Sequence, residues 1–262
     1  MRRSWCISLA TLAVAGSTLL ATSAAEASSA PPTPGHTAVQ PGGLVTGLTQ
    51  PFTSQNGAVR NATSTNWSGY AVTGSGLTSV SASWVEPTGH CTSSGSQYSS
   101  FWVGLDGYNS NSVEQTGSSV DCHSKSPKYY AWYEMFPAYP VNFSNKVKPG
   151  DHFSASVVYK SGGKFTMKIT DSTEHWTHSI TKSSTTAKRS SAEVIVEAPS
   201  SSTGVLPLAD FGKVNVSASK VNGSAIGNHH AIKITMKSGG TTKDTVTALS
   251  HGTNFSATWK HA

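Results

Sequence analysis

Two polar side chains in strand-like stretches of this chain could together hydrolyse an amide bond. Glu193 lies within Ala192–Glu197, and Gln115 lies within Val113–Gly117. Amide hydrolysis by water needs a base that activates the water, a donor that stabilises the oxyanion, and an acid that protonates the leaving nitrogen. A glutamate can act first as the base and then as the acid, while a glutamine amide can act as the donor. Taken alone, each residue is more often an ordinary polar strand residue.

Three further segments accompany this pair in a fixed order. They read NWSGY at Asn66–Tyr70, FWVGLDG at Phe101–Gly107 and YYAWYEMFP at Tyr129–Pro137. With the two segments above, this series resembles the glutamic peptidases, also called eqolisins, from about Asn66 to Phe211. We therefore expect a secreted, bacterial-type member of that family.

The resemblance implies a concanavalin-like jelly-roll β-sandwich that acts as an endopeptidase at acidic pH. It implies that Glu193 is the general base and then the acid, and that Gln115 stabilises the oxyanion and orients the water. The same residue-by-residue matching gives substrate-binding positions at Trp67, Trp102, Asp106, Trp132 and Glu134. Fungal members commonly have an acidic residue where Tyr130 stands, and one more residue between Asp106 and Gln115. These departures affect subsite preference and pH optimum, and they leave the reaction type standing.

Strand periodicity places the chemistry on one side of the predicted sheet. Side chains alternate between the two faces of a strand, so Trp132 and Glu134 share one face. Glu193, Ile195 and Glu197 likewise share a face, opposite an apolar set that indicates the core. We expect the face with tryptophan and carboxylate side chains to line a groove that binds a polymer.

Composition indicates an exported all-β protein. Charged residues make up 12% of the chain, about half the usual share for a soluble protein, and 19 Lys and Arg stand against 13 Asp and Glu. The lysines are scattered, and no nucleic-acid signature accompanies them, so the basic balance does not indicate a nucleic-acid partner. With few ion-paired carboxylates to lose on protonation, the composition is compatible with acid tolerance.

The N-terminus predicts export and a removable segment. Two arginines, an apolar run and the small-residue site Ala25-Glu26-Ala27 indicate a signal peptide over residues 1–27. Residues 28–62 are rich in Pro, Gly, Ser and Thr and predict a propeptide or linker, so the β-sandwich domain would span 63–262. In an oxidising compartment, Cys91 and Cys122 should form one disulfide.

Short alternating stretches separated by turns predict an all-β antiparallel sandwich. The predicted strands lie at 70–72, 80–85, 153–159, 165–169, 214–216, 232–236 and 255–259. Two pairs of histidines, at 175 and 178 and at 229 and 230, lack further ligands that could complete a metal site, so we expect no metal and no cofactor. The expected protein is a secreted monomer that acts on polypeptides, with no membrane partner.

Two other readings of the same residues stay open. In a glycoside hydrolase, Glu134 and Glu193 would flank the scissile bond as the two carboxylates, and Gln115 would have no role. A non-catalytic carbohydrate-binding module would keep the tryptophans without requiring Glu193 and Gln115 to converge. Changing Glu193 to Gln separates the classes, because an enzyme would lose activity and a binding module would bind as before.

Overall fold

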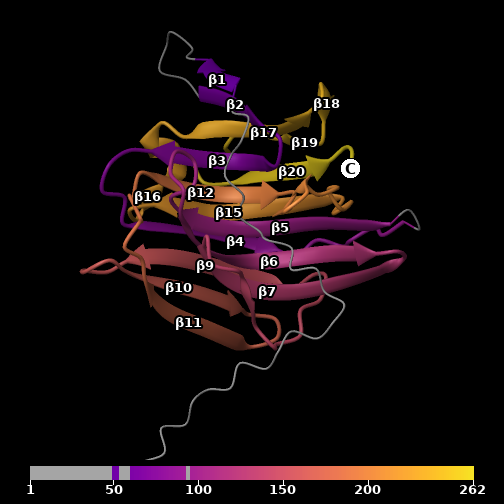
Figure 1. Cartoon of the computed structure of the whole chain (residues 1–262), viewed down its shortest axis with the longest axis horizontal. Coiled ribbons are helices and arrows are strands. Elements are labelled where there is room, and N and C mark those ends of the chain that lie inside the picture. The colour runs from indigo at the N-terminus through magenta and orange to yellow at the C-terminus, as the bar shows by residue number, and fades with distance from the viewer. Residues whose placement is uncertain (1–48, 53–59, 93–94) are drawn as a thin grey trace, which may run out of the picture. The chain divides into compact units, whose positions relative to one another are not determined.

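Two β-sheets that pack against each other form the folded part of the chain (Figure 1). The computed structural model describes the backbone of residues 49–52 and all of residues 60–92 and 95–262. These residues belong to a compact unit that spans Ala38–Ala262. The predicted signal peptide and most of the predicted propeptide lie outside the described residues.

The larger sheet carries the predicted catalytic residues. Its hydrogen-bonded order is β1 (Thr49–Phe52), β2 (Arg60–Ser64), β17 (Ile232–Ser238), β3 (Trp67–Thr73), β12 (Ser191–Glu197), β5 (Ser96–Leu105), β6 (Val113–His123), β7 (Ser126–Phe136) and β8 (Val141–Asn142), with β18 (Thr241–Thr242) beside β17. All neighbours in this sheet are antiparallel except β2 and β17, which run parallel.

The second sheet has eight strands. Its order is β11 (Trp176–Ser183), β10 (Lys164–Asp171), β9 (His152–Tyr159), β4 (Ser79–Val85), β15 (Lys213–Val221), β20 (Phe255–Trp259) and β19 (Asp244–Val246), with β16 (Ser224–Ala225) beside β15. Outside the sheets lie the ribbon of β13 (Ser200–Ser201) and β14 (Gly204–Val205) and the 3-10 turn η1 (Ile226–His229). The described residues contain no α-helix, and no helix among them is long and apolar enough to cross a membrane.

The predicted strands and their faces are confirmed. Each stretch of alternating residues named above falls within a strand, and Ser161–Gly163 turns β9 into β10 as an antiparallel hairpin. Phe165, Met167 and Ile169 of β10 and the even-numbered residues of β12 are apolar and meet in one core between the sheets. The antiparallel β-sandwich is therefore confirmed, and alternation is its physical cause, because each sheet buries one face against the other.

A second apolar cluster lies on the opposite face of the larger sheet. It contains Trp67, Trp102, Trp132, Ile195 and Val113, with neighbours from β2, β3 and β17. This is the face that parity assigned to the groove. The groove face is thus apolar in its own right and separate from the core of the sandwich.

The predicted start of the domain at residue 63 falls inside a strand. Strand β2 begins at Arg60 and pairs with β17 from Ile232↔Arg60 to Met236↔Ser64. Strand β1 lies within the predicted propeptide and pairs with β2. Residues on both sides of the predicted boundary therefore contribute to one sheet, and the site at which the chain is trimmed stays a prediction.

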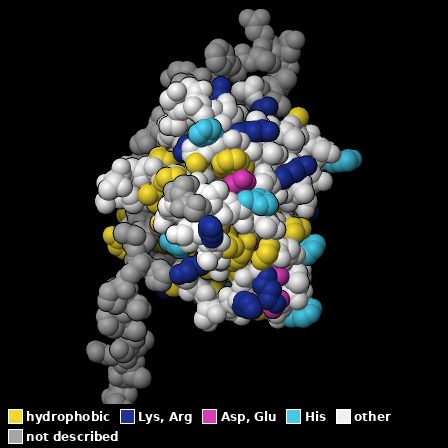
Figure 2. Space-filling view, turned by 90° about the vertical axis from the view of Figure 1, so that its right-hand side faces the viewer, with side chains coloured by type: hydrophobic (Ala, Val, Ile, Leu, Met, Phe, Trp, Pro, Cys, Tyr) yellow, Lys and Arg dark blue, Asp and Glu magenta, His cyan; other side chains and the backbone are white. Residues whose placement is uncertain are grey.

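Most carboxyl groups are buried. Of the twelve Asp and Glu residues in the described part of the chain, ten are buried, and only Glu174 and Asp210 keep partial exposure. Figure 2 shows one face on which lysine, arginine and histidine side chains outnumber acidic ones. Burial penalises the charged form, so it raises the pKa of Glu86 and Glu114 to about 8 and of Asp121 and Asp244 to about 7.

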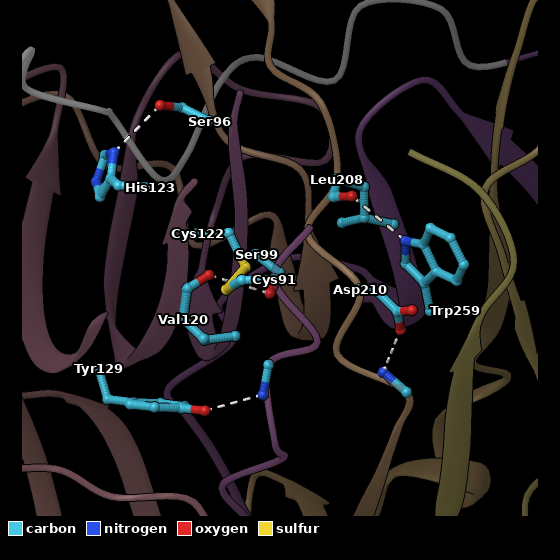
Figure 3. The surroundings of a disulfide bond; sticks show 12 residues. Cys91, Ser96, Ser99, Val120, Cys122, His123, Tyr129, Leu208, Asp210 and Trp259 are labelled. Carbon is cyan, nitrogen blue, oxygen red and sulfur yellow. Dashed lines mark hydrogen bonds between the residues drawn. A yellow bond between two sulfur atoms is a disulfide. The ribbon is translucent and has the colours of Figure 1, made fainter. Parts of the chain in front are cut away.

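The predicted disulfide is present. Cys91 and Cys122 are bonded, with their Cα atoms 5.2 Å apart, and they close a loop across 31 positions of sequence. The bond attaches the segment after β4 to β6, the strand that carries Gln115 (Figure 3). Nearby, the backbone N–H of Gly89 donates to the Tyr129 hydroxyl at 2.9 Å.

Candidate active site

The two predicted catalytic residues lie in one cross-strand row of the larger sheet. The register pairs Glu193 of β12 with Gly104 of β5, and Gly104 with Gln115 of β6. Gln115 is paired in turn with Glu134 of β7. Directly paired residues point to the same face, so the three polar side chains rise from the groove face side by side. Glu193 and Gln115 are two strand spacings apart, about 10 Å between Cα atoms.

Gly104 lets neighbouring side chains pack closely over the backbone between Glu193 and Gln115. A Cβ atom at this position would lie 2.8 Å from the Trp102 ring, 3.1 Å from Val113 and 3.2 Å from the Cβ of Gln115. Contacts below 3.0 Å force a shift, so any side chain here would displace the groove floor. Glycine within a strand weakens the strand, and a close approach of another group is a common reason to keep it. Sequence reasoning missed Gly104, although a glycine inside a strand pattern was the available signal.

Gln115 is held by Glu134. The Gln115 amide Nε2 donates to Glu134 Oε2 at 2.6 Å, and both side chains are fully buried. Burial raises the pKa of Glu134 well above its usual range, with the neighbouring Glu197 adding to the effect and the Gln115 hydrogen bond opposing it. A glutamine amide carries two N–H groups that point in different directions. One can donate to Glu134 while the second points away from Glu134.

Glu193 occupies a strongly desolvated position. Its side chain is fully buried, and no donor among the described residues lies in hydrogen-bond geometry to either oxygen. Burial raises the pKa of Glu193 well above its usual range. The Ser191 hydroxyl and the Tyr108 amide oppose this shift from nearby, while Asp106 and Glu114 reinforce it. Glu193 shares this burial-driven rise with Glu86 and Glu114, so the pKa alone does not distinguish an acid–base residue.

Asp106 accepts hydrogen bonds from the backbone of the segment just before β12. Its Oδ2 accepts the backbone N–H groups of Lys188 at 2.8 Å and Arg189 at 2.7 Å. Its Oδ1 accepts the backbone N–H of Ser190 at 2.9 Å and that residue's hydroxyl at 3.0 Å. The Asp106 amide also donates to the Ser191 carbonyl at 2.9 Å. Asp106 thereby fixes the start of β12, two residues before Glu193, and its predicted direct contact with substrate stays a prediction.

The three predicted tryptophans belong to the apolar cluster on this face of the larger sheet, and their contact with substrate stays a prediction. Trp67 and Trp102 meet edge to face with ring centroids 5.0 Å apart. Trp132 donates its indole N–H to the Ser119 hydroxyl at 2.8 Å. All three are almost fully buried in the full-length chain. Trp132 is paired with Gly117, where a Cβ would lie 2.2 Å from the Phe101 carbonyl, so the sheet leaves no room for a side chain beside the rings.

Glu197 joins this group, although it was not among the predicted site residues. Trp102 donates its indole N–H to Glu197 Oε2 at 2.8 Å, and the Asn66 amide donates to Oε1 at 3.3 Å. Parity placed Glu197 on the groove face, but a strand pattern cannot show which partners a carboxylate meets. In the described residues, Glu197 orients Trp102 from the side opposite the catalytic row.

No group of three or more His, Cys, Asp or Glu side chains in the described part of the chain could hold a metal ion. The chemistry that the arrangement supports is acid–base chemistry on a water molecule. The participating groups would be the Glu193 carboxyl and the Gln115 amide.

Comparison with known proteins decides the family. The sequence profile of the Peptidase A4 family matches residues 65–259, about three quarters of the chain. This chain belongs to the Peptidase A4 family. The match begins two residues before Trp67 and ends at Trp259, so it includes all seven predicted catalytic and substrate-binding residues. The expected family, and with it the expected class of enzyme, a peptidase, is confirmed.

This chain is similar in sequence to a known relative and in fold to solved structures of glutamic peptidases. Aspergillopepsin-2 of Aspergillus niger is 29% identical over 197 residues, which cover 66% of this chain and 70% of the relative. Scytalido-glutamic peptidase, solved with a transition state analog inhibitor, superposes with a TM-score of 0.65 at 25% identity, covering 75% of this chain and 98% of that one. Aspergilloglutamic peptidase from Aspergillus niger gives a TM-score of 0.56 at 25% identity, covering 63% and 99%.

Proposed function

We propose that this member of the Peptidase A4 family is a secreted endopeptidase that cleaves polypeptides at acidic pH with Glu193 and Gln115 as its catalytic residues. The observation that carries the proposal is the cross-strand row in which Gly104 separates these two side chains. Family membership favours a peptidase over the glycoside hydrolase and the carbohydrate-binding module. Gln115 also has a role in this proposal, because it lies on the same face of the larger sheet as Glu193.

The proposed reaction needs only a water molecule besides the two side chains. Ionised Glu193 takes a proton from the water as its oxygen bonds to the carbonyl carbon of the substrate. The carbonyl π electrons move to the oxygen, and an N–H of the Gln115 amide stabilises the negative charge. As the C–N bond breaks, Glu193 returns the proton to the leaving nitrogen. The products are a carboxylic acid and an amine, and Glu193 is again ionised.

Glu134 has a positioning role in this scheme. Its hydrogen bond from Gln115 orients the amide before substrate arrives, so the donor does not need to reorganise during the reaction. The raised pKa of Glu134 keeps this carboxyl neutral at acidic pH. A second charge near the developing oxyanion, which would destabilise it, is thereby avoided.

The full-length chain as described would be latent. Glu193, Gln115 and the three tryptophans are buried, so a polypeptide cannot reach them without a change in the structure. We propose that the active enzyme forms after the predicted propeptide has been removed. Contact of a water molecule with Glu193 would lower its raised pKa towards the usual acidic range, where the base can ionise, while Glu134 stays buried beside Gln115.

Degradation of a denatured protein across pH 2 to 8 tests the proposal. Trimmed wild type would be compared with Glu193→Gln and Gln115→Ala, in the presence of pepstatin and a chelator. Glu174→Gln is the control, since Glu174 lies in an ion pair with Lys148 at the turn after β10. We expect cleavage at acidic pH by wild type and the control, and none by the other two. Full activity in either catalytic variant would refute the proposed dyad.

A further inference from the structure

The outward face of the eight-stranded sheet has an unusual composition. From β15 through β4, β9 and β10 to β11, every regular outward position holds Ser, Thr, Asn, His or Lys, apart from two valines at the strand ends. Four of these residues are lysines, and none is a carboxylate. We call this surface the hydroxyl–lysine face. It lies on the other side of the sandwich from the groove.

Two cross-strand rows define the centre of this face. One row is Lys220, Ser81, Ser156 and Lys168, on β15, β4, β9 and β10. The row beside it contains Ser83 and Ser154. Hydroxyl groups repeat about every 4.8 Å across the strands, and the two lysine Cα atoms stand about 14 Å apart across three strand spacings. Both lysine side chains are exposed.

The face is hollowed at this point. A depression of about 290 Å³ is lined by residues of both rows, including Lys168 and Lys220. It adjoins a second depression of about 320 Å³, which shares Ser83 and Ser154 with it. A bulge in β15 between Ser217 and Lys220 borders both, and a bulge bends the strand that contains it. The surface is therefore a shallow trough lined by hydroxyl groups, with ammonium groups at its sides.

The positive charge of the trough determines which class of partner it can bind. With no carboxylate on the outward positions and most carboxyl groups of the described chain buried, the local potential is positive and attracts anions. The face lacks the aromatic side chains on which nucleic-acid bases stack, and it lacks the large apolar side chains that enter a membrane. Close rows of hydroxyl groups fit a partner that is itself rich in hydroxyl groups.

We propose that the hydroxyl–lysine face binds an anionic polysaccharide, a sugar polymer that carries carboxylate groups. Lys168 and Lys220 pair with the carboxylates, and the serine rows exchange hydrogen bonds with the sugar hydroxyls. Because the groove lies on the opposite sheet, a peptidase held in this way keeps its active site turned away from the polymer. The binding is independent of the catalytic proposal.

Affinity electrophoresis of the full chain tests this inference. The probe is polygalacturonate, and the matched neutral polymer is its fully methyl-esterified form. All proteins would carry Glu193→Gln, so that no proteolysis interferes. We expect retardation by polygalacturonate alone, weakened when NaCl is raised from about 50 to about 200 mM. The double variant Lys168→Ser/Lys220→Ser should bind about tenfold more weakly, as expected for the loss of two charge contacts.

The control is Lys125→Ser/Lys237→Ser, which removes the same charge from exposed positions away from the hydroxyl–lysine face, in the turn between β6 and β7 and on β17. We expect its affinity to stay within about twofold of the parent. Equal losses in both double variants would show that net charge alone causes the binding and would overturn the proposal. Absence of retardation, equal retardation by the neutral polymer, or stronger retardation by double-stranded DNA would each overturn it as well. Thermal unfolding of each variant shows whether it is folded.

Discussion

Buried carboxyl groups should make this fold less stable as the pH rises, and Glu86 offers the sharpest test. Its side chain is almost fully buried at the end of β4, and it accepts a hydrogen bond from the Ser118 hydroxyl, which in turn accepts the Trp84 indole N–H at 2.9 Å. Burial raises the pKa of Glu86 from 4.5 to about 8, with Asp151 and Asp171 contributing.

The sign of the change in stability with pH follows from proton linkage. Between pH 4.5 and 8 the folded chain keeps a proton on Glu86 that the unfolded chain has released, so the free energy of unfolding falls as the pH rises through this window. From pH 4 to pH 7.5 the loss is about 4 kcal/mol for this group alone, on the order of 1.4 kcal/mol for each pKa unit. Small proteins are stable by only about 5–15 kcal/mol, so one such group is a large fraction of the total.

The substitution Glu86→Gln should remove this contribution. A glutamine has nearly the same shape and its carbonyl oxygen can accept the Ser118 hydroxyl, but it does not titrate. Urea denaturation at pH 4 should give similar free energies of unfolding for wild type and variant. At pH 7.5 the variant should be more stable than wild type by about 4 kcal/mol.

Glu174→Gln provides the opposite control. The ion pair with Lys148 lowers the pKa of Glu174, so wild type loses this contribution as the pH falls and not as it rises. If Glu86→Gln and wild type lose stability in parallel between pH 4 and 7.5, then Glu86 is not held neutral in the fold. The reasoning from burial would then be refuted for this residue.

Three further substitutions test the architecture of the site. Gly104→Ala should lower kcat at least about tenfold and also lower the thermal midpoint, because its Cβ would press on the buried Trp102 ring and on Gln115. Unchanged kinetics would show that the alignment of the catalytic residues does not need glycine at this position. Asp106→Asn should lower the free energy of unfolding in urea by about 2–4 kcal/mol and reduce activity, because the amide has one acceptor oxygen where the carboxylate has two. An unaltered urea midpoint would contradict the role of Asp106 at the start of β12. Loss of the disulfide in Cys91→Ser/Cys122→Ser should lower the free energy of unfolding by about 3 kcal/mol, because a cross-link over a loop of this length restricts the unfolded chain. A change below about 1 kcal/mol would contradict this explanation.

Alternation along the strands was sufficient to predict which residues share a face. The parity of Glu193, Ile195 and Glu197, and of Trp132 and Glu134, follows from the two-residue repeat of a β-strand, which depends on local backbone geometry alone. The same repeat identified the apolar core side, because burying one face of each sheet is the condition for a sandwich. The family resemblance, carried by short ordered segments, supplied the pairing of Glu193 with Gln115.

Only the tertiary structure decided which of these residues meet. Register between strands far apart in sequence placed Gly104 between Glu193 and Gln115, and nothing in either segment specifies that register. Burial of most described carboxyl groups, and with it the raised pKa of groups such as Glu86 and Glu193, depends on packing between distant parts of the chain. The Asp106 carboxylate likewise turns to backbone N–H groups of residues 188–190. The sequence by itself determined residue types and strand faces, because these are local, whereas register, desolvation and hydrogen-bond partners are properties of contacts between distant segments.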